Sequence, residues 1–327
     1  MLYKKKRLVL WLVIAVISLC TALYFYRPLR SFVPFHKKFL EIARNCYYRI
    51  PPVFRNPLCS FSEVEKGPLS RQCIEENFKH LMDRSRLVSE DSEGYQLWET
   101  PKGQFWVPAK NGFGNIISNL AEQECKMYGS GKVGVRSDDI VLDCGANVGA
   151  YTREALNAGA KLIVAIEPSP GNIKCLHQNF KTEIEQGRVI IYEKGVWNRE
   201  EILTFYTSED SETDTFVFSR KRKDSHVTTM PVTTIDKLVD ELKLDRVDFI
   251  KMDIEGSEEN ALIGAKKTIA KYRPRMALAL EHATDYKKEI GRMLNIIRSS
   301  YPKYQTQCGY CGITREGRQD CNILYIY

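Results

Sequence analysis

The segment 143–149, with the sequence DCGANVG, restricts the fold of this chain more than any other segment. It overlaps the end of the apolar run IVLDC at 140–144 and precedes a predicted helix at 150–157, after which the run KLIVAIE predicts a second strand. Gly145 and Gly149 permit a tight turn and let a ligand approach the bare backbone. The pattern therefore predicts a strand–loop–helix–strand unit that binds a nucleotide-like ligand at its loop.

Two acidic residues indicate which ligand the loop binds. Glu167 ends the second predicted strand, where a carboxylate can accept both hydrogen bonds of a ribose diol. Asp143 would repel a pyrophosphate, but it can hold the ammonium group of a methionine moiety, directly or through water. The loop also lacks the GxGxxG pattern of dinucleotide-binding proteins. Either acid alone would be an ordinary strand-end residue, but together they favour S-adenosylmethionine.

Strands and helices continue to alternate after Glu167. A helix begins at Ser169 and Pro170, which are typical residues for the N-cap and the first helical position. Further strands are predicted for RVIIYEKGV, EILTFYT, HVTTMPV, VDFIKMDI and RMALALEH, and further helices for TTIDKLVDEL and SEENALIGAKKTIA. Ahead of this region, residues 95–107 predict a hairpin and residues 116–128 a helix. The alternation favours an α/β fold with a mainly parallel sheet covered by helices on both faces.

A second group of charged residues lies in the sequence KMDIEGSEE. Lys251, Asp253 and Glu255 occupy alternate positions, so in an extended strand their side chains point to one side, near the transferred methyl group. Methyl transfer to a hydroxyl requires an aligned nucleophile that loses its proton, and Asp253, Glu255 or His282 can act as the base. Chemistry favours His282, whose ordinary pKa is about 6.5, and position favours Asp253. The alternatives are a structural Lys251–Asp253 ion pair and a surface His282.

Four motifs together resemble a known family. DIVLDCGANVGAYT, VAIEPSPGNIKCL, VTTIDKL and VDFIKMDIEGSEENALIGA are similar to successive motifs of the FkbM family of S-adenosylmethionine-dependent methyltransferases, named for an enzyme that methylates a macrolide hydroxyl. The resemblance covers residues 138–282 and implies a class I methyltransferase fold, which is Rossmann-like with a seven-stranded sheet, and O-methylation. It also implies the residues that line the cofactor: Asp143, Gly145, Asn147, Gly149 and Glu167, with Asn172 in the next helix and segment 193–196, including Gly195, near the adenine.

The N-terminal region differs from the rest of the chain in charge. Residues 1–50 hold ten Lys or Arg and one Glu, so that the remainder is slightly acidic and lacks the basic surface of a nucleic-acid binder. Residues 8–26 are uncharged, long enough to cross a bilayer, and followed by no small-residue cleavage site. The sequence therefore predicts a basic flank at 1–7, a transmembrane helix at 8–26, a stalk or lead-in segment at 27–90, and a methyltransferase domain at 91–327.

The charges beside this membrane anchor do not decide its orientation. Lysines and an arginine at 4–7 favour a cytoplasmic N-terminus, whereas Arg27, Arg30, Lys37 and Lys38 favour the opposite. S-adenosylmethionine is made in the cytosol, so a catalytic domain on the other side would need imported cofactor. The prediction is a single-pass membrane protein, with the side of its catalytic domain left open.

The chain has ten cysteines. Cys144 and Cys175 fall inside the predicted nucleotide fold, where a small buried thiol is the commoner role. Cys308, Cys311 and Cys321 form a CxxC pair and one more, for which local packing is favoured over a disulfide or a metal site. No second CxxC and no nearby His completes a zinc site, so no metal is predicted.

These observations predict a membrane-anchored enzyme that methylates a hydroxyl on a sugar, glycolipid or secondary metabolite. Its expected partners are a small-molecule or glycan acceptor and the membrane, without nucleic acid, and nothing indicates the oligomeric state. One alternative is a non-catalytic S-adenosylmethionine-binding scaffold at the membrane, which the acceptor-side group of Lys251, Asp253, Glu255 and His282 disfavours. The other is a membrane-bound NAD-dependent dehydrogenase, which the missing GxGxxG disfavours.

Overall fold

The structure is a computed structural model that describes residues 61–110, 112–208, 225–280, 286–313 and 319–327. The chain divides into two compact units, Met1–Phe54 and Arg55–Tyr327, and all described residues belong to the second. The predicted basic flank at 1–7, the anchor at 8–26 and His282 lie outside the described residues. Among the helices that the structure does describe, none is long and apolar enough to cross a membrane.

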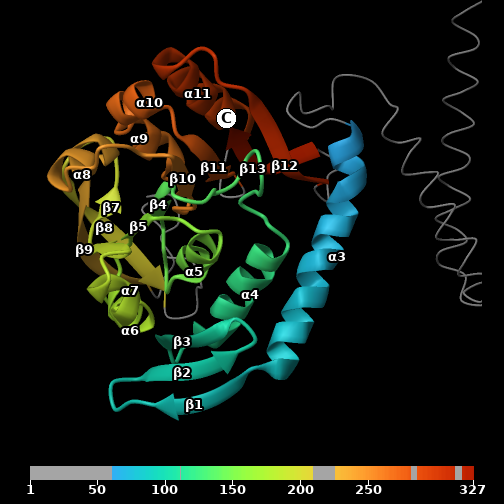
Figure 1. The fold of residues 1–327 in the computed structure, drawn as a ribbon, viewed down its shortest axis with the longest axis vertical. Coiled ribbons are helices and arrows are strands. Elements are labelled where there is room, and N and C mark those ends of the chain that lie inside the picture. The colour runs from blue at the N-terminus through green and yellow to red at the C-terminus, as the bar shows by residue number, and fades with distance from the viewer. Residues whose placement is uncertain (1–60, 111, 209–224, 281–285, 314–318) are drawn as a thin grey trace, which may run out of the picture. The chain divides into compact units, whose positions relative to one another are not determined.

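A seven-stranded sheet forms the centre of the second unit (Figure 1), in the order β12-β13-β11-β10-β4-β5-β6. Its strands are β4 (Ile140–Cys144), β5 (Leu162–Ile166), β6 (Val189–Tyr192), β10 (Phe249–Met252), β11 (Arg275–Ala279), β12 (Thr306–Ile313) and β13 (Gln319–Ile326). Strands β6, β5, β4, β10 and β11 pair in parallel, and β13 is antiparallel to both β11 and β12. The predicted α/β class with a mainly parallel seven-stranded sheet is confirmed.

Helices cover this sheet. Every residue of β4 and β10 is buried, so both faces of the sheet are covered at its centre. The helices after the N-terminal region are α4 (Gly112–Glu124), α5 (Ala150–Asn157), α6 (Pro170–Asn179), α7 (Lys181–Glu185), α8 (Ile235–Glu241), α9 (Glu258–Ile263), α10 (Lys266–Tyr272) and α11 (Tyr286–Ser300). Helix α6 begins at Pro170 after Ser169, as predicted, and Thr234 caps α8 by accepting a hydrogen bond from the Lys237 amide.

Two predicted elements are divided in the structure. The predicted strand RVIIYEKGV forms β6 in the central sheet and β7 (Gly195–Val196) in a second sheet of order β7-β9-β8, with β8 (Glu201–Ser208) and β9 (Ser225–Thr233). The helix predicted for SEENALIGAKKTIA is interrupted between α9 and α10. Gly264 lies at this break, where a Cβ atom would be 2.1 Å from the Trp197 carbonyl oxygen. Close packing of the two chain segments therefore requires a glycine there.

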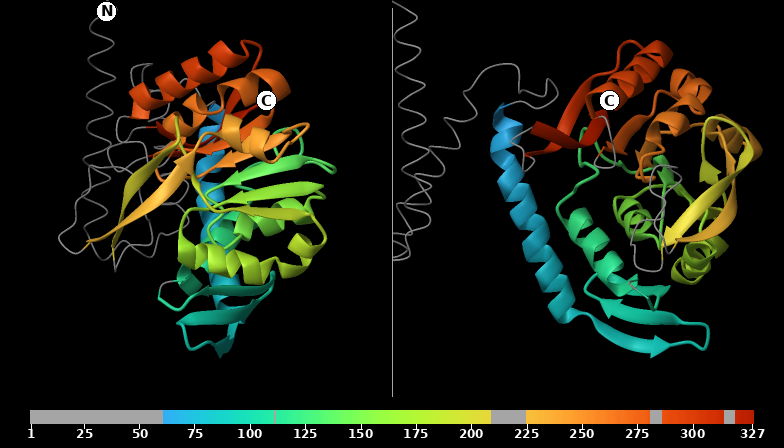
Figure 2. Two further views of the ribbon diagram at one scale, coloured as in Figure 1. Left: turned by 90° about the vertical axis from the view of Figure 1, so that its left-hand side faces the viewer. Right: turned by 180° about the vertical axis from the view of Figure 1, so that it is seen from behind.

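Residues 61–90, ahead of the predicted methyltransferase domain, are part of the second unit. Helix α3 (Phe61–Arg84) lies beside α4 (Figure 2), and a three-stranded sheet follows it, made of β1 (Arg86–Glu90), β2 (Tyr95–Thr100) and β3 (Gly103–Pro108). Leu81 of α3 is 1% exposed and packs in one cluster with Phe105 and Ile116. Residues 61–90 of the predicted stalk or lead-in segment thus belong to the compact unit, where α3 packs against apolar residues of β3 and α4.

Four of the described cysteines form two disulfides. Cys144 and Cys175 are buried free thiols, as predicted. Cys308 and Cys321 are joined across the β12–β13 hairpin, so the favoured interpretation of local packing is wrong for this pair. The hairpin brings their Cα atoms to 5.5 Å, a separation that a disulfide spans readily. A second disulfide, which the sequence did not suggest, joins Cys73 of α3 to Cys125 just after α4.

Candidate active site

The candidate site lies where the order of the parallel strands reverses. From β4 the chain continues outward through β5 and β6 on one side, and returns to β10 and β11 on the other. In such sheets ligands bind beyond the carboxyl ends of the strands at this switch point. Strands β4 and β10 end in register, with Cys144 opposite Met252, and the Asp253 amide donates to the Cys144 carbonyl at 3.1 Å. The loop at 145–149 and Asp253 therefore start from the same edge.

The loop after β4 needs its glycines for conformation and for space. Gly145 and Gly149 have φ of +80° and +99°, in the left-handed region that glycine enters without strain. A Cβ atom would lie 2.0 Å from the Asp253 carbonyl oxygen at Gly145, and 2.1 Å from Cε2 of Phe180 at Gly149. Asn147, between them, also has a positive φ of 51°. The loop is thus pressed against the end of β10 and against the residue after α6.

Glu167 connects this loop to the start of α6. It follows β5 directly and is 6% exposed. Its Oε2 accepts a hydrogen bond from the Asn147 amide at 2.9 Å, and its Oε1 accepts from the Ser169 amide at 3.0 Å and from Nδ2 of Asn172 at 3.3 Å. Burial raises the pKa of Glu167, although these hydrogen bonds oppose the rise. Three predicted cofactor residues, Asn147, Glu167 and Asn172, therefore meet at one point.

Asp143 faces the interior of the sheet. Its side chain is fully buried, Oδ2 accepts a hydrogen bond from Oγ1 of Thr152 at 2.7 Å, and Oδ1 lies 3.4 Å from Nζ of Lys251. A direct contact between this carboxylate and a methionine ammonium, which was one of the two contacts predicted, does not fit this arrangement. Asp143 instead contacts Thr152 of α5 and Lys251 of β10.

Lys251 is the cation that Asp143 faces. Its Nζ donates to the Gly145 carbonyl at 2.8 Å and lies 5.3 Å from the ring centroid of Tyr128 and 5.9 Å from that of Tyr151. Burial acts to lower the pKa of Lys251, but the charges of the neighbouring carboxylates outweigh it and the pKa is raised. The alternative interpretation from the sequence paired Lys251 with Asp253, whereas the structure gives an ion pair of Lys251 with Asp143. Lys251 thus contacts the backbone of the glycine loop at Gly145.

The predicted alignment of three charges along a strand is wrong. Strand β10 ends at Met252, so Asp253 and Glu255 follow it in a turn, where Glu255 has φ of 56°. Only Lys251 belongs to the strand, and its side chain is buried in the sheet. After the strand, the Ile254 amide donates a hydrogen bond at 2.9 Å to Oε1 of Glu258, at the start of α9. Asp253 is half-buried at the sheet edge, as its predicted role requires.

Tyr128 is a site residue that sequence reasoning missed. The predicted helix at 116–128 includes it, but α4 ends at Glu124 and Tyr128 lies in the turn that follows. Its hydroxyl donates to Oδ2 of Asp253 at 2.7 Å, across 125 residues of sequence. No spacing or motif indicates a contact over such a separation, since only the order of the sheet brings the two segments together.

A hollow of about 330 Å³ has Pro168, the residue after Glu167, in its lining. Glu193 belongs to its lining and to the segment 193–196 that was predicted to lie near the adenine. Gly195 is buried in β7, paired with Val232, and is not among the lining residues. The other residues that line the hollow are Pro170, Ile173, Lys174, Thr229, Met230 and Pro231. In the part of the chain that the structure describes, no group of three or more His, Cys, Asp or Glu side chains can hold a metal ion.

The sheet order, the glycine loop and the acid after β5 together define a methyltransferase-type α/β protein. A family model, the methyltransferase FkbM domain, matches residues 143–310, slightly more than half of the chain. The chain therefore belongs to the FkbM methyltransferase family, which confirms the resemblance seen in its motifs. The predicted cofactor, S-adenosylmethionine, is confirmed at the level of the family.

Solved structures with a similar fold include several methyltransferases. The methyltransferase FkbM from Methylobacillus flagellatus KT is 20% identical with a TM-score of 0.44, and the match covers 80% of this chain and 60% of that one. Fibrillarin from Aeropyrum pernix, with natively bound S-adenosyl-L-methionine, is 12% identical with a TM-score of 0.39, over 74% and 99% of the two chains. An O-methyltransferase from Bacillus cereus in complex with SAH is 12% identical with a TM-score of 0.35, over 57% and 73%. The chain thus spans about 60% of the length of the Methylobacillus protein, and no curated protein matches it.

Proposed function

We propose that this protein transfers a methyl group from S-adenosylmethionine to a hydroxyl of a sugar, a glycolipid or a secondary metabolite. The observation that carries the proposal is the convergence of the glycine loop, Glu167 and Asp253 at the switch point of the sheet. The first two suit a nucleoside cofactor, and the third is a carboxylate at the same edge. A cofactor side and an acceptor side therefore lie next to each other.

The residues around the loop fit this cofactor. Glu167 has both carboxylate oxygens at the junction of the loop and α6, where they can accept hydrogen bonds from a ribose diol. The adjoining hollow, with Pro168 and Glu193 in its lining, offers space for the adenine. When bound, S-adenosylmethionine supplies an electrophilic methyl group on a sulfonium. Gly145 and Gly149 let the loop take its left-handed conformation and pack closely against Asp253 and Phe180.

The protein's own part in the reaction is to align the acceptor and to take up its proton. Asp253 is the base of the proposal, because it lies at the carboxyl edge of β10 and its carboxylate is half-buried. Proton removal by a positioned carboxylate typically contributes about 10²- to 10⁴-fold to the rate. Lys251 acts indirectly by holding the Gly145 carbonyl. Glu255 is a weaker candidate, because the turn takes it away from the strand, and His282 lies outside the described residues.

The two alternatives from the sequence are less well supported. Membership of a methyltransferase family argues against an NAD-dependent dehydrogenase. A non-catalytic scaffold would need the glycine loop but no ordered carboxylate beside it, whereas Tyr128 fixes Asp253 at that position through a 2.7 Å hydrogen bond. The site thus supports an enzyme.

The two disulfides support a location in an oxidising compartment. Structural disulfides such as Cys73–Cys125 and Cys308–Cys321 persist in secretory or extracellular surroundings and are rare in the cytosol. Together with the uncharged segment 8–26, they support a single-pass anchor whose N-terminus faces the cytosol and whose enzyme unit faces the oxidising side. Such a compartment must receive S-adenosylmethionine by import. Protease protection of residues 61–327 in sealed membranes tests this topology, and cleavage without detergent would contradict it.

Mass spectrometry of acceptors tests the activity. The full-length protein in detergent is incubated with methyl-deuterated S-adenosylmethionine and mixtures of glycans, glycolipids and small hydroxylated metabolites. We expect a labelled methyl ether that Glu167→Ala abolishes and Glu193→Ala reduces only partly. Label on nitrogen or carbon would contradict O-methylation. A failure of S-adenosylhomocysteine (SAH) to bind in calorimetry would contradict the cofactor site itself.

A further inference from the structure

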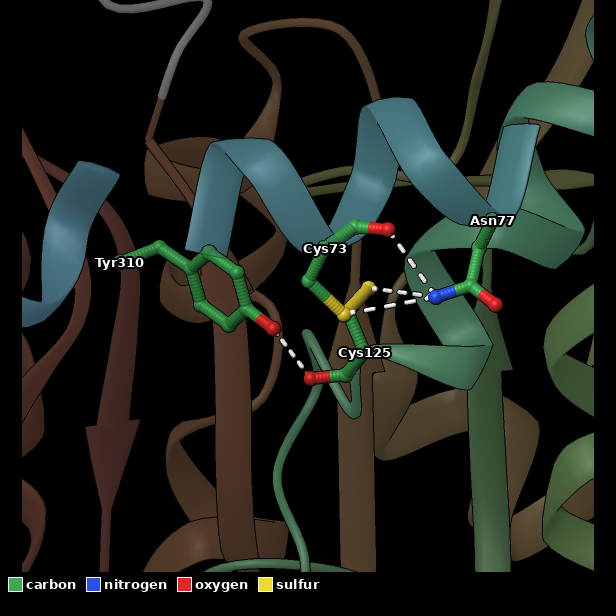
Figure 3. The surroundings of a disulfide bond; sticks show 4 residues. All are labelled: Cys73, Asn77, Cys125 and Tyr310. Carbon is green, nitrogen blue, oxygen red and sulfur yellow. Dashed lines mark hydrogen bonds between the residues drawn. A yellow bond between two sulfur atoms is a disulfide. The ribbon is translucent and has the colours of Figure 1, made fainter. Parts of the chain in front are cut away.

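The turn at 125–128 is fixed more firmly than its short length suggests. Cys125 is bonded to Cys73 of α3, and its carbonyl accepts a hydrogen bond from the Tyr310 hydroxyl. Figure 3 shows these contacts, with Nδ2 of Asn77 lying 3.5 Å from both sulfur atoms of the disulfide. The Met127 carbonyl accepts a hydrogen bond from the Tyr325 hydroxyl at 2.6 Å. The turn is therefore held by a covalent bond on one side and by the C-terminal hairpin on the other.

This turn presents Tyr128 to the active site. The Tyr128 side chain is 3% exposed, and its ring packs edge-on against that of Tyr151 with centroids 5.4 Å apart. Nζ of Lys251 lies 5.3 Å from the Tyr128 ring centroid. With the ring fixed on these sides, the hydroxyl has little freedom, and it donates to Oδ2 of Asp253 at 2.7 Å. A charge-assisted hydrogen bond of this length is both strong and directional.

The hydrogen bond from Tyr128 bears directly on the orientation of the Asp253 side chain. Asp253 lies one residue beyond β10, outside the regular geometry of the strand, and it is half-buried. A base must approach the proton that it removes within hydrogen-bond distance, and a displacement of about 1 Å can cost roughly 10²-fold in rate. A donor held by a rigid turn meets this requirement.

We propose that Tyr128 is a positioning residue for the methyl transfer, which orients the Asp253 carboxylate toward the acceptor hydroxyl. The inference rests on the proposed function, in which Asp253 is the base. Tyr128 itself does not exchange a proton with the acceptor. It contributes through the hydrogen bond from its hydroxyl, whereas its ring contributes to packing. Phenylalanine at this position therefore retains the packing and loses the orientation.

The test is a double-mutant cycle of Tyr128→Phe and Asp253→Ala, with Tyr304→Phe as the matched control. Tyr304 is also a buried tyrosine whose hydroxyl donates at 2.7 Å, but its acceptor is the Pro274 carbonyl, outside the site. Thermal unfolding is measured for all variants without ligand. We expect Tyr128→Phe to lower Tm by roughly 3 to 6 °C in the wild-type background and by clearly less when Asp253 is already alanine. Equal shifts in both backgrounds would overturn the contact.

Kinetics separate positioning from a purely structural role. With the acceptor mixtures described above, Tyr128→Phe should lower kcat about tenfold or more, while the Kd for SAH stays within about twofold of the wild type. Tyr304→Phe should leave kcat unchanged at temperatures below its Tm. If both variants turn over equally, the positioning role is wrong although the enzyme is active. If the wild type methylates no acceptor, the proposed function fails instead, and the thermal cycle still decides whether Tyr128 orients Asp253.

Discussion

Nζ of Lys251 lies 3.4 Å from Oδ1 of Asp143, and both side chains are almost fully enclosed, at 5% and 0% exposure. The same ammonium group donates to the Gly145 carbonyl at 2.8 Å. One buried charge pair thus joins β10 to β4 and holds the loop that begins the cofactor site. Because each charge is stable in the interior only with its partner, the pair connects folding stability to the geometry of the site.

Removing one member of this pair should lower the free energy of unfolding. Lys251→Met leaves the Asp143 carboxylate buried without its partner, and we expect a loss of about 3 to 5 kcal/mol in unfolding free energy. The double variant Lys251→Met, Asp143→Asn should recover part of that loss. Lys237→Met serves as the control, because its ion pair with Glu200 is exposed to solvent and should contribute little to stability. Urea denaturation measures all three, and equal losses for Lys251→Met and Lys237→Met would refute the interpretation.

Gly145 and Gly94 provide a matched comparison for the loop. Their φ values are +80° and +83°, but a Cβ atom at Gly145 would meet the Asp253 carbonyl oxygen at 2.0 Å, whereas at Gly94 nothing lies within 4 Å. Alanine at either position therefore pays about 1 to 2 kcal/mol for the left-handed backbone, and only Gly145→Ala also displaces the end of β10. We expect Gly145→Ala to weaken SAH binding at least tenfold in calorimetry, and Gly94→Ala to leave it unchanged. Similar affinities for the two variants would show that the loop tolerates the side chain.

The sequence alone predicted those parts of the site that depend on residues close together in the chain. The glycines after β4 and Glu167 after β5 could be placed because apolar runs and turn residues show where each strand ends. The side chain of Asp253 was placed correctly at the sheet edge, but for the wrong reason, since β10 ends at Met252 and strand alternation does not extend to it.

Contacts between distant segments could not be predicted in this way. Tyr128 and Asp253 are 125 residues apart, and Cys73 and Cys125 are 52 apart. Which segments meet depends on the order of strands in the sheet and on how α3 packs against α4, and one sequence without that arrangement allows many pairings. The role of α3 was missed for the same reason, because its apolar positions have partners only in the folded unit.

We expect Glu167 to make cofactor binding depend on pH. Burial raises its pKa above the ordinary value of 4.5, so its contribution to stability is present below that value and is lost as pH rises through the raised pKa. The ribose hydroxyls donate to the ionised carboxylate, so SAH binding favours ionisation and its affinity should increase with pH over that interval. Calorimetry at a series of pH values above 4.5 measures this increase, which Glu167→Gln should abolish. An affinity that is constant or falls with pH in the wild type would contradict the assignment of Glu167 to the ribose.

The two disulfides should differ in what their removal does. Chain entropy predicts a loss of about 4 kcal/mol for Cys73–Cys125, which closes a loop of 52 residues, and about 3 kcal/mol for Cys308–Cys321, which closes 13. Only Cys125 belongs to the turn that carries Tyr128. We therefore expect the double Cys→Ser variant at 73 and 125 to lose methyl transfer at temperatures where the protein remains folded, and the variant at 308 and 321 to retain more of it. Hydrogen exchange at residues 125–128 provides a second measurement, because the first variant should lose protection there. If both variants lose activity only in proportion to their stability, the disulfide at 73 and 125 stabilises the fold without positioning the turn.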